Sequence, residues 1–207
     1  MKYIFVAGAP GSKWSSVVKN IYYSPSIDRS DYRDQWTYYH DASGSMDLMH
    51  LGAYFDPGME CDIPENIAEL DRKQLEALFD APFGSAKSGL RIIKSHIFAN
   101  HIDFIRETWP DAPIVLVHRG DDACLGWWVK CGHFDITYPS YDHYYRDLRT
   151  MAGIIAEQNK NILDAWWKYD GKYVTDNLQL ASALMLENPP EQYRQDYVKS
   201  DVRVKVI

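Results

Sequence analysis

Lys2–Tyr22 has the sequence KYIFVAGAPGSKWSSVVKNIY, and this stretch decides the fold class. Its first part, Lys2–Ala7, is mostly apolar and predicts a buried strand. A Gly-rich turn follows, and apolar residues then recur at helical spacing over Trp14–Tyr22. A strand, a Gly-rich loop and a helix in this order are typical of an α/β protein whose loop binds an anion at the helix N-terminus.

The same alternation continues along the chain. Two further apolar runs predict strands at Leu90–Lys94 and Ile114–His118. Helical patterns are found at Pro64–Pro82, Ala99–Trp109, Asp121–Cys131, Asp142–Tyr169, Asp176–Leu186 and Pro190–Lys199. Alternating strands and helices predict an α/β fold, a P-loop-like parallel sheet flanked by helices, and the 207 residues suit one domain over 1–207.

The segment Ser24–Gly58 lacks clear periodicity and is rich in Tyr, Asp, His, Ser and Gly. We expect mostly loop, with a short helix near Met46–Leu51, forming a lid or acceptor-side insertion, because long irregular segments in compact domains usually carry function. The candidate acceptor-side residues in it are Tyr39, His40, His50 and Tyr54. A satellite core under a long loop explains its aromatic residues equally well.

The composition narrows the class of protein. Hydrophobic residues make up 46% of the chain, enough for a core, and the net charge of −7 argues against a general nucleic-acid binder. No apolar run is long enough to predict a membrane span, and the first residues predict a strand rather than a signal peptide. Three cysteines without a CxxC pair predict reduced thiols, no metal site and a cytoplasmic protein.

Three segments leave the carboxyl ends of the predicted strands, namely Gly8–Ser16, Ser95–Asn100 and His118–Asp122. In parallel sheets these ends share one edge, where ligands bind, so we expect the three segments to converge. The first offers backbone N–H groups and the Lys13 ammonium to a phosphate, although it lacks the spacing GxxxxGK[ST] of a Mg·ATP loop. A Gly-Pro turn without a ligand is the alternative.

The other two segments carry groups suited to group transfer. His96 titrates near neutrality and can take a proton from a hydroxyl, while Lys94 can neutralise developing charge. Arg119 can bind a phosphate through two N–H groups. The alternatives are a structural histidine and an Arg119 paired with Asp121 or Asp122.

Together the three motifs resemble the sulfotransferases that use 3′-phosphoadenosine-5′-phosphosulfate (PAPS). Pro10–Ser16, PGSKWSS, is similar to their phosphosulfate loop, and Lys94-Ser95-His96 is similar to the K-T-H that ends the next core strand. The stretch Ile114–Trp128, IVLVHRGDDACLGWW, resembles the strand, Arg and aromatic pair of their 3′-phosphate site. The resemblance covers a little under a third of the chain.

The resemblance implies a three-layer α/β/α fold and transfer of a sulfuryl group from PAPS, without a metal, to a hydroxyl or amine of a small-molecule or saccharide acceptor. His96 would be the general base, helped by Lys13 and Lys94. The residues that it implies for binding PAPS or its product 3′,5′-adenosine bisphosphate (PAP) are Pro10, Gly11, Ser12, Lys13, Trp14, Ser15, Ser16, Arg119 and Trp127, with Trp14 or Trp127 stacking on adenine.

The chain departs from that family at three places. Gly11 stands where the family has Lys or Arg, and Gly126 aligns with its phosphate-binding Ser. A later R-K-G-x-x-G-D-W segment has no counterpart. A non-catalytic binding protein of the same fold, or a divergent P-loop kinase of nucleotides or small molecules, therefore remains as an alternative.

Overall fold

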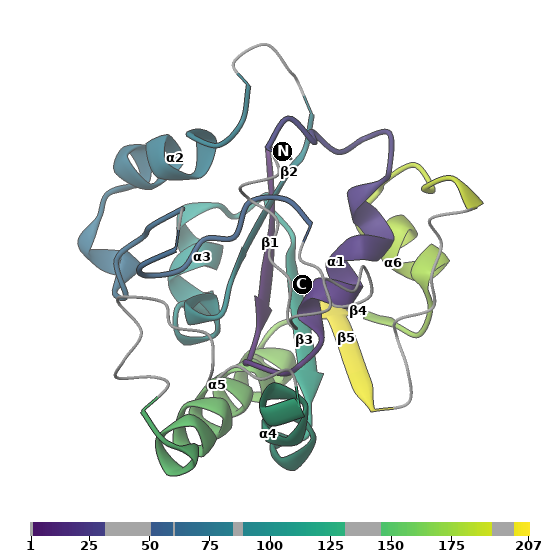
Figure 1. Cartoon of the computed structure of the whole chain (residues 1–207). Coiled ribbons are helices and arrows are strands. Elements are labelled where there is room, and N and C mark those ends of the chain that lie inside the picture. The colour runs from purple at the N-terminus through teal and green to yellow at the C-terminus, as the bar shows by residue number, and fades with distance from the viewer. Residues whose placement is uncertain (1, 32–50, 60, 85–88, 131–145, 192–200) are drawn as a thin grey trace.

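A five-stranded sheet forms the centre of the molecule (Figure 1). The computed structural model describes residues 2–31, 51–59, 61–84, 89–130, 146–191 and 201–207. The strands are β1 (Tyr3–Gly8), β2 (Arg91–Ser95), β3 (Ile114–Arg119), β4 (Lys172–Val174) and β5 (Val202–Val206). Their order across the sheet is β2-β1-β3-β5-β4.

The sheet is mixed, not wholly parallel as predicted. β1 pairs in parallel with β2 and β3, which confirms the arrangement expected for the three apolar runs. β5 pairs antiparallel with both β3 and β4. Neither β4 nor β5 was predicted. Both are short, and β4 is exposed at Lys172 and Tyr173, so neither has the continuous apolar run that marked the buried strands.

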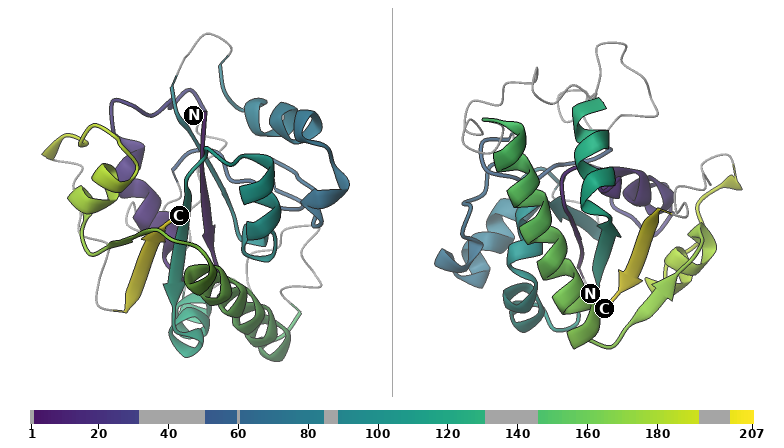
Figure 2. Two further views of the ribbon diagram at one scale, coloured as in Figure 1. Left: turned by 180° about the vertical axis from the view of Figure 1, so that it is seen from behind. Right: turned by 90° about the horizontal axis from the view of Figure 1, so that it is seen from below.

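Helices cover both faces of the sheet (Figure 2). They are α1 (Trp14–Tyr22), α2 (Arg72–Asp80), α3 (Ile102–Thr108), α4 (Asp121–Lys130), α5 (Leu148–Lys168) and α6 (Asn177–Ala183), with short 3-10 helices η3 (Ile67–Glu69) and η4 (Ile97–Asn100). Along β1, Ile4 and Val6 pack with α1 and α6, whereas Phe5 and Ala7 pack with α3 and the C-terminal half of α5. Within the described part of the chain, no helix is both long and apolar enough to cross a membrane.

Two predicted helices have different bounds. The pattern over Pro64–Pro82 is divided into η3 and α2, because Asp71 adopts an extended backbone and caps α2 by accepting from the Gln74 amide. The helix predicted from Asp142 begins instead at Leu148, where Asp147 is the N-cap. In both cases the helix begins after the aspartate whose carboxylate accepts the N3 amide, and not where the apolar pattern begins.

Several predictions lie outside the described residues. They concern most of the helix near Met46–Leu51, the last residue of Asp121–Cys131, the first residues of Asp142–Tyr169, and most of Pro190–Lys199. The described ends of Ser24–Gly58 contain no helix or strand, only single bridges from Ile27 to Leu90 and from Phe55 to Cys61.

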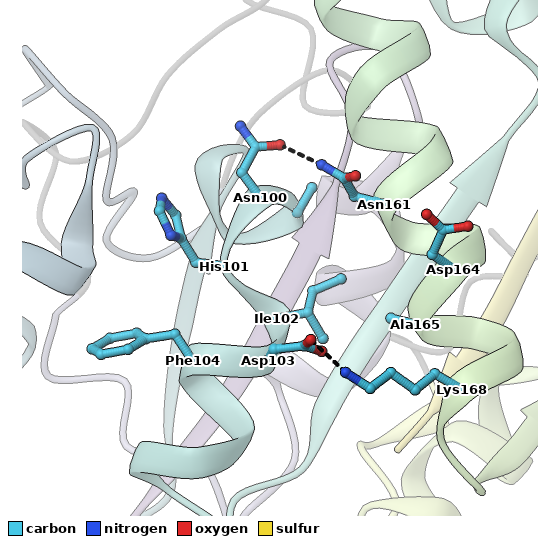
Figure 3. A pocket seen from close by; sticks show the side chains of 10 residues that line it. Asn100, His101, Ile102, Asp103, Phe104, Asn161, Asp164, Ala165 and Lys168 are labelled. Atoms are coloured by element: carbon cyan, nitrogen blue, oxygen red, sulfur yellow. Dashed lines mark hydrogen bonds and ion pairs between the residues drawn. The ribbon is translucent and has the colours of Figure 1, made fainter.

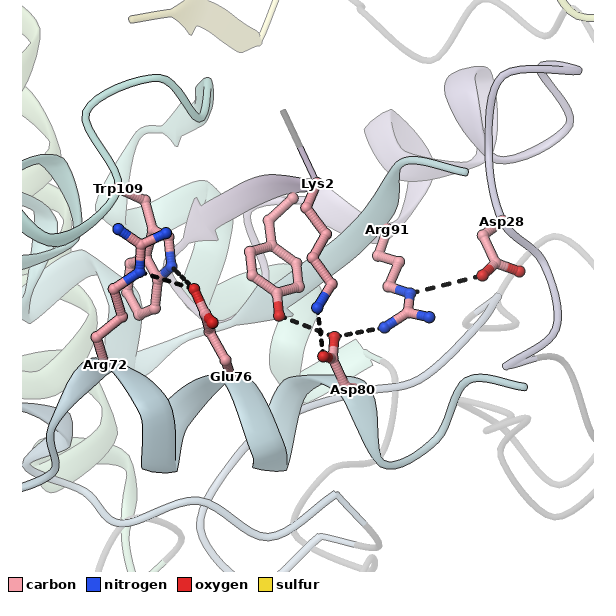
Figure 4. A network of polar contacts seen from close by, with 8 residues as sticks. Lys2, Asp28, Arg72, Glu76, Asp80, Arg91 and Trp109 are labelled. Atoms are coloured by element: carbon pink, nitrogen blue, oxygen red, sulfur yellow. Dashed lines mark hydrogen bonds and ion pairs between the residues drawn. The ribbon is translucent and has the colours of Figure 1, made fainter. Parts of the chain in front are cut away.

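Charged side chains fix the amino end of the sheet, opposite the loop after β1 (Figure 4). The Asp80 carboxylate on α2 accepts from Lys2, from the Tyr3 hydroxyl at 2.8 Å and from Arg91. Arg91 is also paired with the buried Asp28 at 3.5 Å. These contacts attach α2 to β1 and β2 and leave the carboxyl ends of the strands for function.

Candidate active site

Side chains from β2 and β3 meet the loop that follows β1. The Nδ1 atom of His96 lies 2.6 Å from the carbonyl oxygen of Gly8, and Nη1 of Arg119 donates to the carbonyl oxygen of Gly11 at 3.0 Å. All three predicted segments therefore converge at one edge of the sheet, as their order along the chain predicted.

The loop is built tightly around two glycines. Gly11 has φ +78°, and a Cβ there would lie 2.0 Å from the Cys124 carbonyl oxygen on α4. No side chain fits at Gly11 in this backbone without a shift of the loop or of α4. A Cβ on Gly8 would lie 2.7 Å from Oγ of Ser12. That hydroxyl is fully buried and has no hydrogen-bond partner among the described residues.

Lys13 begins α1 in an unusual conformation. It is the N-cap, with φ 64°, and its side chain makes no capping hydrogen bond. The first turn of α1 contains no acidic residue, so a cation stands at the positive end of the helix dipole. Left-handed backbone at a non-glycine residue costs about 1–3 kcal/mol and persists where the surrounding structure imposes it, most often at functional sites. This helix N-terminus is suited to an anion.

Lys13 and Arg119 point to one carboxylate, that of Asp201. The Oδ2 atom of Asp201 accepts from Nε and Nη2 of Arg119 at 2.8 and 2.7 Å and lies 3.7 Å from Nζ of Lys13. The Trp127 ring lies beside the same cations, with its centroid 4.8 Å from Lys13, 5.9 Å from Arg119 and 5.4 Å from Lys130. Two cations and one indole ring therefore surround the Asp201 carboxylate at this edge of the sheet.

Asp201 is a candidate site residue that the sequence analysis missed. The alternative to phosphate binding was a pairing of Arg119 with Asp121 or Asp122. Asp121 instead accepts from Asn159 of α5 at 2.6 Å, and Arg119 pairs with a residue 82 positions away. The signal that points to it is the alternation in Val202–Val206, which predicts a strand and places Asp201 at its start.

His96 is held as a neutral imidazole. A carbonyl oxygen can only accept, so Nδ1 carries the proton and donates it to Gly8, and Nε2 is the acceptor nitrogen of the neutral ring. Burial lowers the pKa of His96, against opposing effects of Asp56 and of the Gly8 carbonyl. Trp14 and Tyr54 pack against the imidazole, with ring centroids 4.7 and 5.8 Å away.

The Asp56 carboxylate organises this wall of the site. It is fully buried and accepts from Oγ of Ser95 and from the hydroxyl of Tyr54, both at 2.5 Å. It therefore fixes the residue before His96 and one ring that packs on it. No local sequence pattern singles out Asp56 within the irregular segment around it.

Lys94 does not join the cations around Asp201. It is wholly buried on the α1 face, and its ammonium donates to the Leu51 carbonyl oxygen. Burial lowers its pKa to about 8, partly offset by the Asp31 carboxylate. Asp31 in turn accepts from the Ala53 amide at 2.6 Å and from the Tyr22 hydroxyl at 3.1 Å. These contacts fasten residues 51–53 to the sheet, a structural task that differs from the predicted stabilisation of the transferring group.

The aromatic candidates differ in exposure. Trp14 is 2% exposed, so its ring has no face left for an adenine, whereas Trp127 is half-buried. Tyr54 and Phe55 are buried in the core, as the satellite-core interpretation predicted for these two residues. Tyr39, His40 and His50 lie outside the described residues.

A pocket of about 390 Å³ lies between α3 and α5 (Figure 3). Two pairs of its polar groups are joined to one another, Lys168 with Asp103 at 2.5 Å and Asn161 with Asn100 at 3.0 Å. None of the predicted site residues lines it. Among the residues that the structure describes, no group of three His, Cys, Asp or Glu side chains is placed to hold a metal ion.

Comparison with known proteins adds no family. No protein-family model, no curated protein and no solved structure matches this chain.

Proposed function

We propose that this protein is a sulfotransferase-like enzyme that moves a sulfuryl group from PAPS to a hydroxyl or amine of a small-molecule or saccharide acceptor. The observation that carries the proposal is the meeting of Lys13 and Arg119, from two different strand ends, on one carboxylate oxygen of Asp201. Arg119 and the neutral His96 also contact the same stretch of backbone, at Gly11 and at Gly8. Such a site can bind a phosphate and take a proton without a metal.

The residues fit the donor PAPS. Ser12 has a buried hydroxyl that a phosphate oxygen would satisfy, and Lys13 stands at the N-terminus of α1. Arg119, with Lys13 beside it, would hold a second phosphate, and the half-buried indole of Trp127 would stack on the adenine. PAPS supplies an activated sulfuryl group, whose bond to the 5′-phosphate oxygen breaks as the acceptor forms a new bond to sulfur.

The chain's own groups then have separate tasks. Nε2 of His96 takes the proton from the acceptor hydroxyl or amine as its oxygen or nitrogen attacks. Lys13 and Arg119 stabilise the negative charge of the phosphates. The loop that carries Lys13 is held in place because the Gly8 and Gly11 carbonyl oxygens are hydrogen-bonded to His96 and Arg119. Lys94 has no place in this step, because its ammonium is engaged at Leu51.

Thermal stabilisation by PAP tests the proposal. PAP at about 100 times its dissociation constant should stabilise the protein by ~2.7 kcal/mol, whereas Mg·ATP and 5′-AMP at equal concentration should not. Arg119→Ala should remove the shift. A shift with Mg·ATP that exceeds the shift with PAP would instead identify a P-loop kinase, and no shift with PAP would remove the proposal.

A non-catalytic binding protein of the same fold is the second candidate, and the engagement of Lys94 away from the cation cluster favours it. His96→Ala separates the two. An enzyme loses turnover in this variant while PAP binding persists, whereas a binding protein shows no sulfuryl transfer to any acceptor in either form.

A further inference from the structure

The carboxylate of Asp201 occupies the edge of Arg119 that ordinarily binds a ligand. Nε and Nη2 form the fork that a guanidinium presents to an oxyanion, and both donate to the same Asp201 oxygen at 2.8 and 2.7 Å. The remaining group Nη1 is bonded to the loop at Gly11. Lys13 approaches the same oxygen at 3.7 Å.

The three side chains differ in their access to solvent. The side chains of Arg119 and Lys13 are 9% and 19% exposed, whereas that of Asp201 is 41% exposed. The buried cations are thus covered by a more exposed acid. The backbone next to Asp201 is fixed, because Val202 pairs with Arg119 in the sheet. A rotation of the Asp201 side chain is therefore enough to free Nε and Nη2 of Arg119 for a ligand.

We propose that Arg119 and Lys13 form an oxyanion subsite for a phosphate group of the ligand, and that Asp201 is the internal anion which this group displaces. The inference rests on the proposed function only for the identity of the ligand. The oxyanion chemistry itself is common to a nucleotide and to free phosphate.

Charge gives Asp201 a role in specificity. Two cations face one carboxylate of charge −1, whereas a phosphate monoester carries about −1.5 to −2 at neutral pH. A doubly charged group therefore replaces the carboxylate with a gain in attraction, and a singly charged anion does not. An anion can bind only those molecules in which the Asp201 carboxylate has moved away from Arg119. The apparent affinity for any anion is therefore its intrinsic affinity multiplied by the fraction of such molecules.

Binding of inorganic phosphate and of PAP to the full chain tests this inference by calorimetry at constant ionic strength. In Asp201→Asn we expect the dissociation constants of both ligands to fall by about tenfold or more, as for a site open in a tenth of the molecules or fewer. The gain should disappear in the double variant Asp201→Asn/Arg119→Ala. Asp122→Asn is the control, because it removes an exposed negative charge from the start of α4.

Two outcomes separate this inference from the proposed function. If Asp201→Asn binds phosphate more tightly than the wild type does, the subsite is supported. If PAP then binds no more tightly than phosphate, PAPS is removed as the donor. If the wild type and Asp201→Asn bind PAP with equal affinity, and Arg119→Ala loses PAP binding, PAPS is supported as the donor and the role of Asp201 is overturned. Asp201→Ser serves as the second variant, and unchanged binding in a folded Asp201→Ser also overturns it.

Discussion

At the scale of single residues, one hydrogen bond decides what His96 can do. The Gly8 carbonyl fixes the proton on Nδ1, so the basic nitrogen is Nε2. The sequence predicted a base at this strand end, but it contained no information on the tautomer, which depends on a loop 88 positions away.

The burial of the His96 imidazole determines the expected pH dependence of turnover. Because burial lowers the pKa of His96, the neutral form persists below pH 6.5, the usual value. The rate should therefore stay level from pH 8 to about pH 6.5 and decline only as the pH falls through the lowered pKa. A pH profile of kcat/KM for the sulfuryl transfer measures this. A decline that begins near pH 7.5 would contradict the tautomer and the burial described here.

Gly11→Ala should destabilise the fold by about 2 kcal/mol or more. The backbone has φ +78°, and the new methyl group would lie 2.0 Å from the carbonyl oxygen of Cys124, so the loop or α4 must move. Denaturant unfolding measures the change. Gly153→Ala is the matched control, since it lies in α5 with nothing within 4 Å of the added Cβ and should be neutral or stabilising by up to about 1 kcal/mol.

At the scale of elements, the sequence predicted the helices and strands that are determined by residues close together in the chain. The bounds of α1 agree at both ends, because a Gly-rich turn precedes it and its apolar spacing is regular. β5 was missed although its alternation is visible, because its pairing with β3 brings together parts of the chain that are far apart. Antiparallel pairing also cannot be read from apolar runs alone.

The carboxylate of Asp80 on α2 supplies a prediction at this scale. Burial opposes its ionisation, but the hydrogen bonds from Lys2, Tyr3 and Arg91 outweigh burial and lower its pKa. A lowered folded-state pKa means that its stabilisation is complete above the unfolded value near 4 and is lost as the pH falls through the folded value. Asp80→Asn should therefore cost about 1–3 kcal/mol at pH 7 and much less at pH 2.

Urea unfolding at both pH values measures the effect of Asp80→Asn. Asp164→Asn is the control, because its pairing with Lys160 joins two exposed side chains on α5 and is worth less than about 0.5 kcal/mol. An equal loss for the two variants would mean that the network at the amino end of the sheet contributes no more than a surface ion pair.

At the scale of the whole molecule, the sheet separates two cores. One core contains Ile4, Val6 and the apolar faces of α1 and α6, and the other contains Phe5, Ala7 and the aromatic side chains around Phe79. Both meet across β1 and β3, whose residues are buried almost throughout, whereas β4 is a sheet edge with two exposed residues.

Amide hydrogen exchange should reproduce this arrangement. We expect the amides of Val115–Val117 in β3 to exchange only through global unfolding, and those of Lys172–Val174 in β4 to exchange more than about 100-fold faster through local opening. Mass spectrometry of proteolytic fragments measures both. Equal protection of the two strands would mean that the sheet opens as one unit.

The position of β5 has a consequence for how the protein is made. Val202–Val206 lies between β3 and β4, and both of these strands are synthesised before it. A nascent chain that still holds residues 202–206 inside the ribosomal exit tunnel has an unpaired edge on β3, the kind of edge that recruits other chains and chaperones. The sheet is therefore completed after these residues emerge, and Arg119 has neither Asp201 nor its finished surroundings until then.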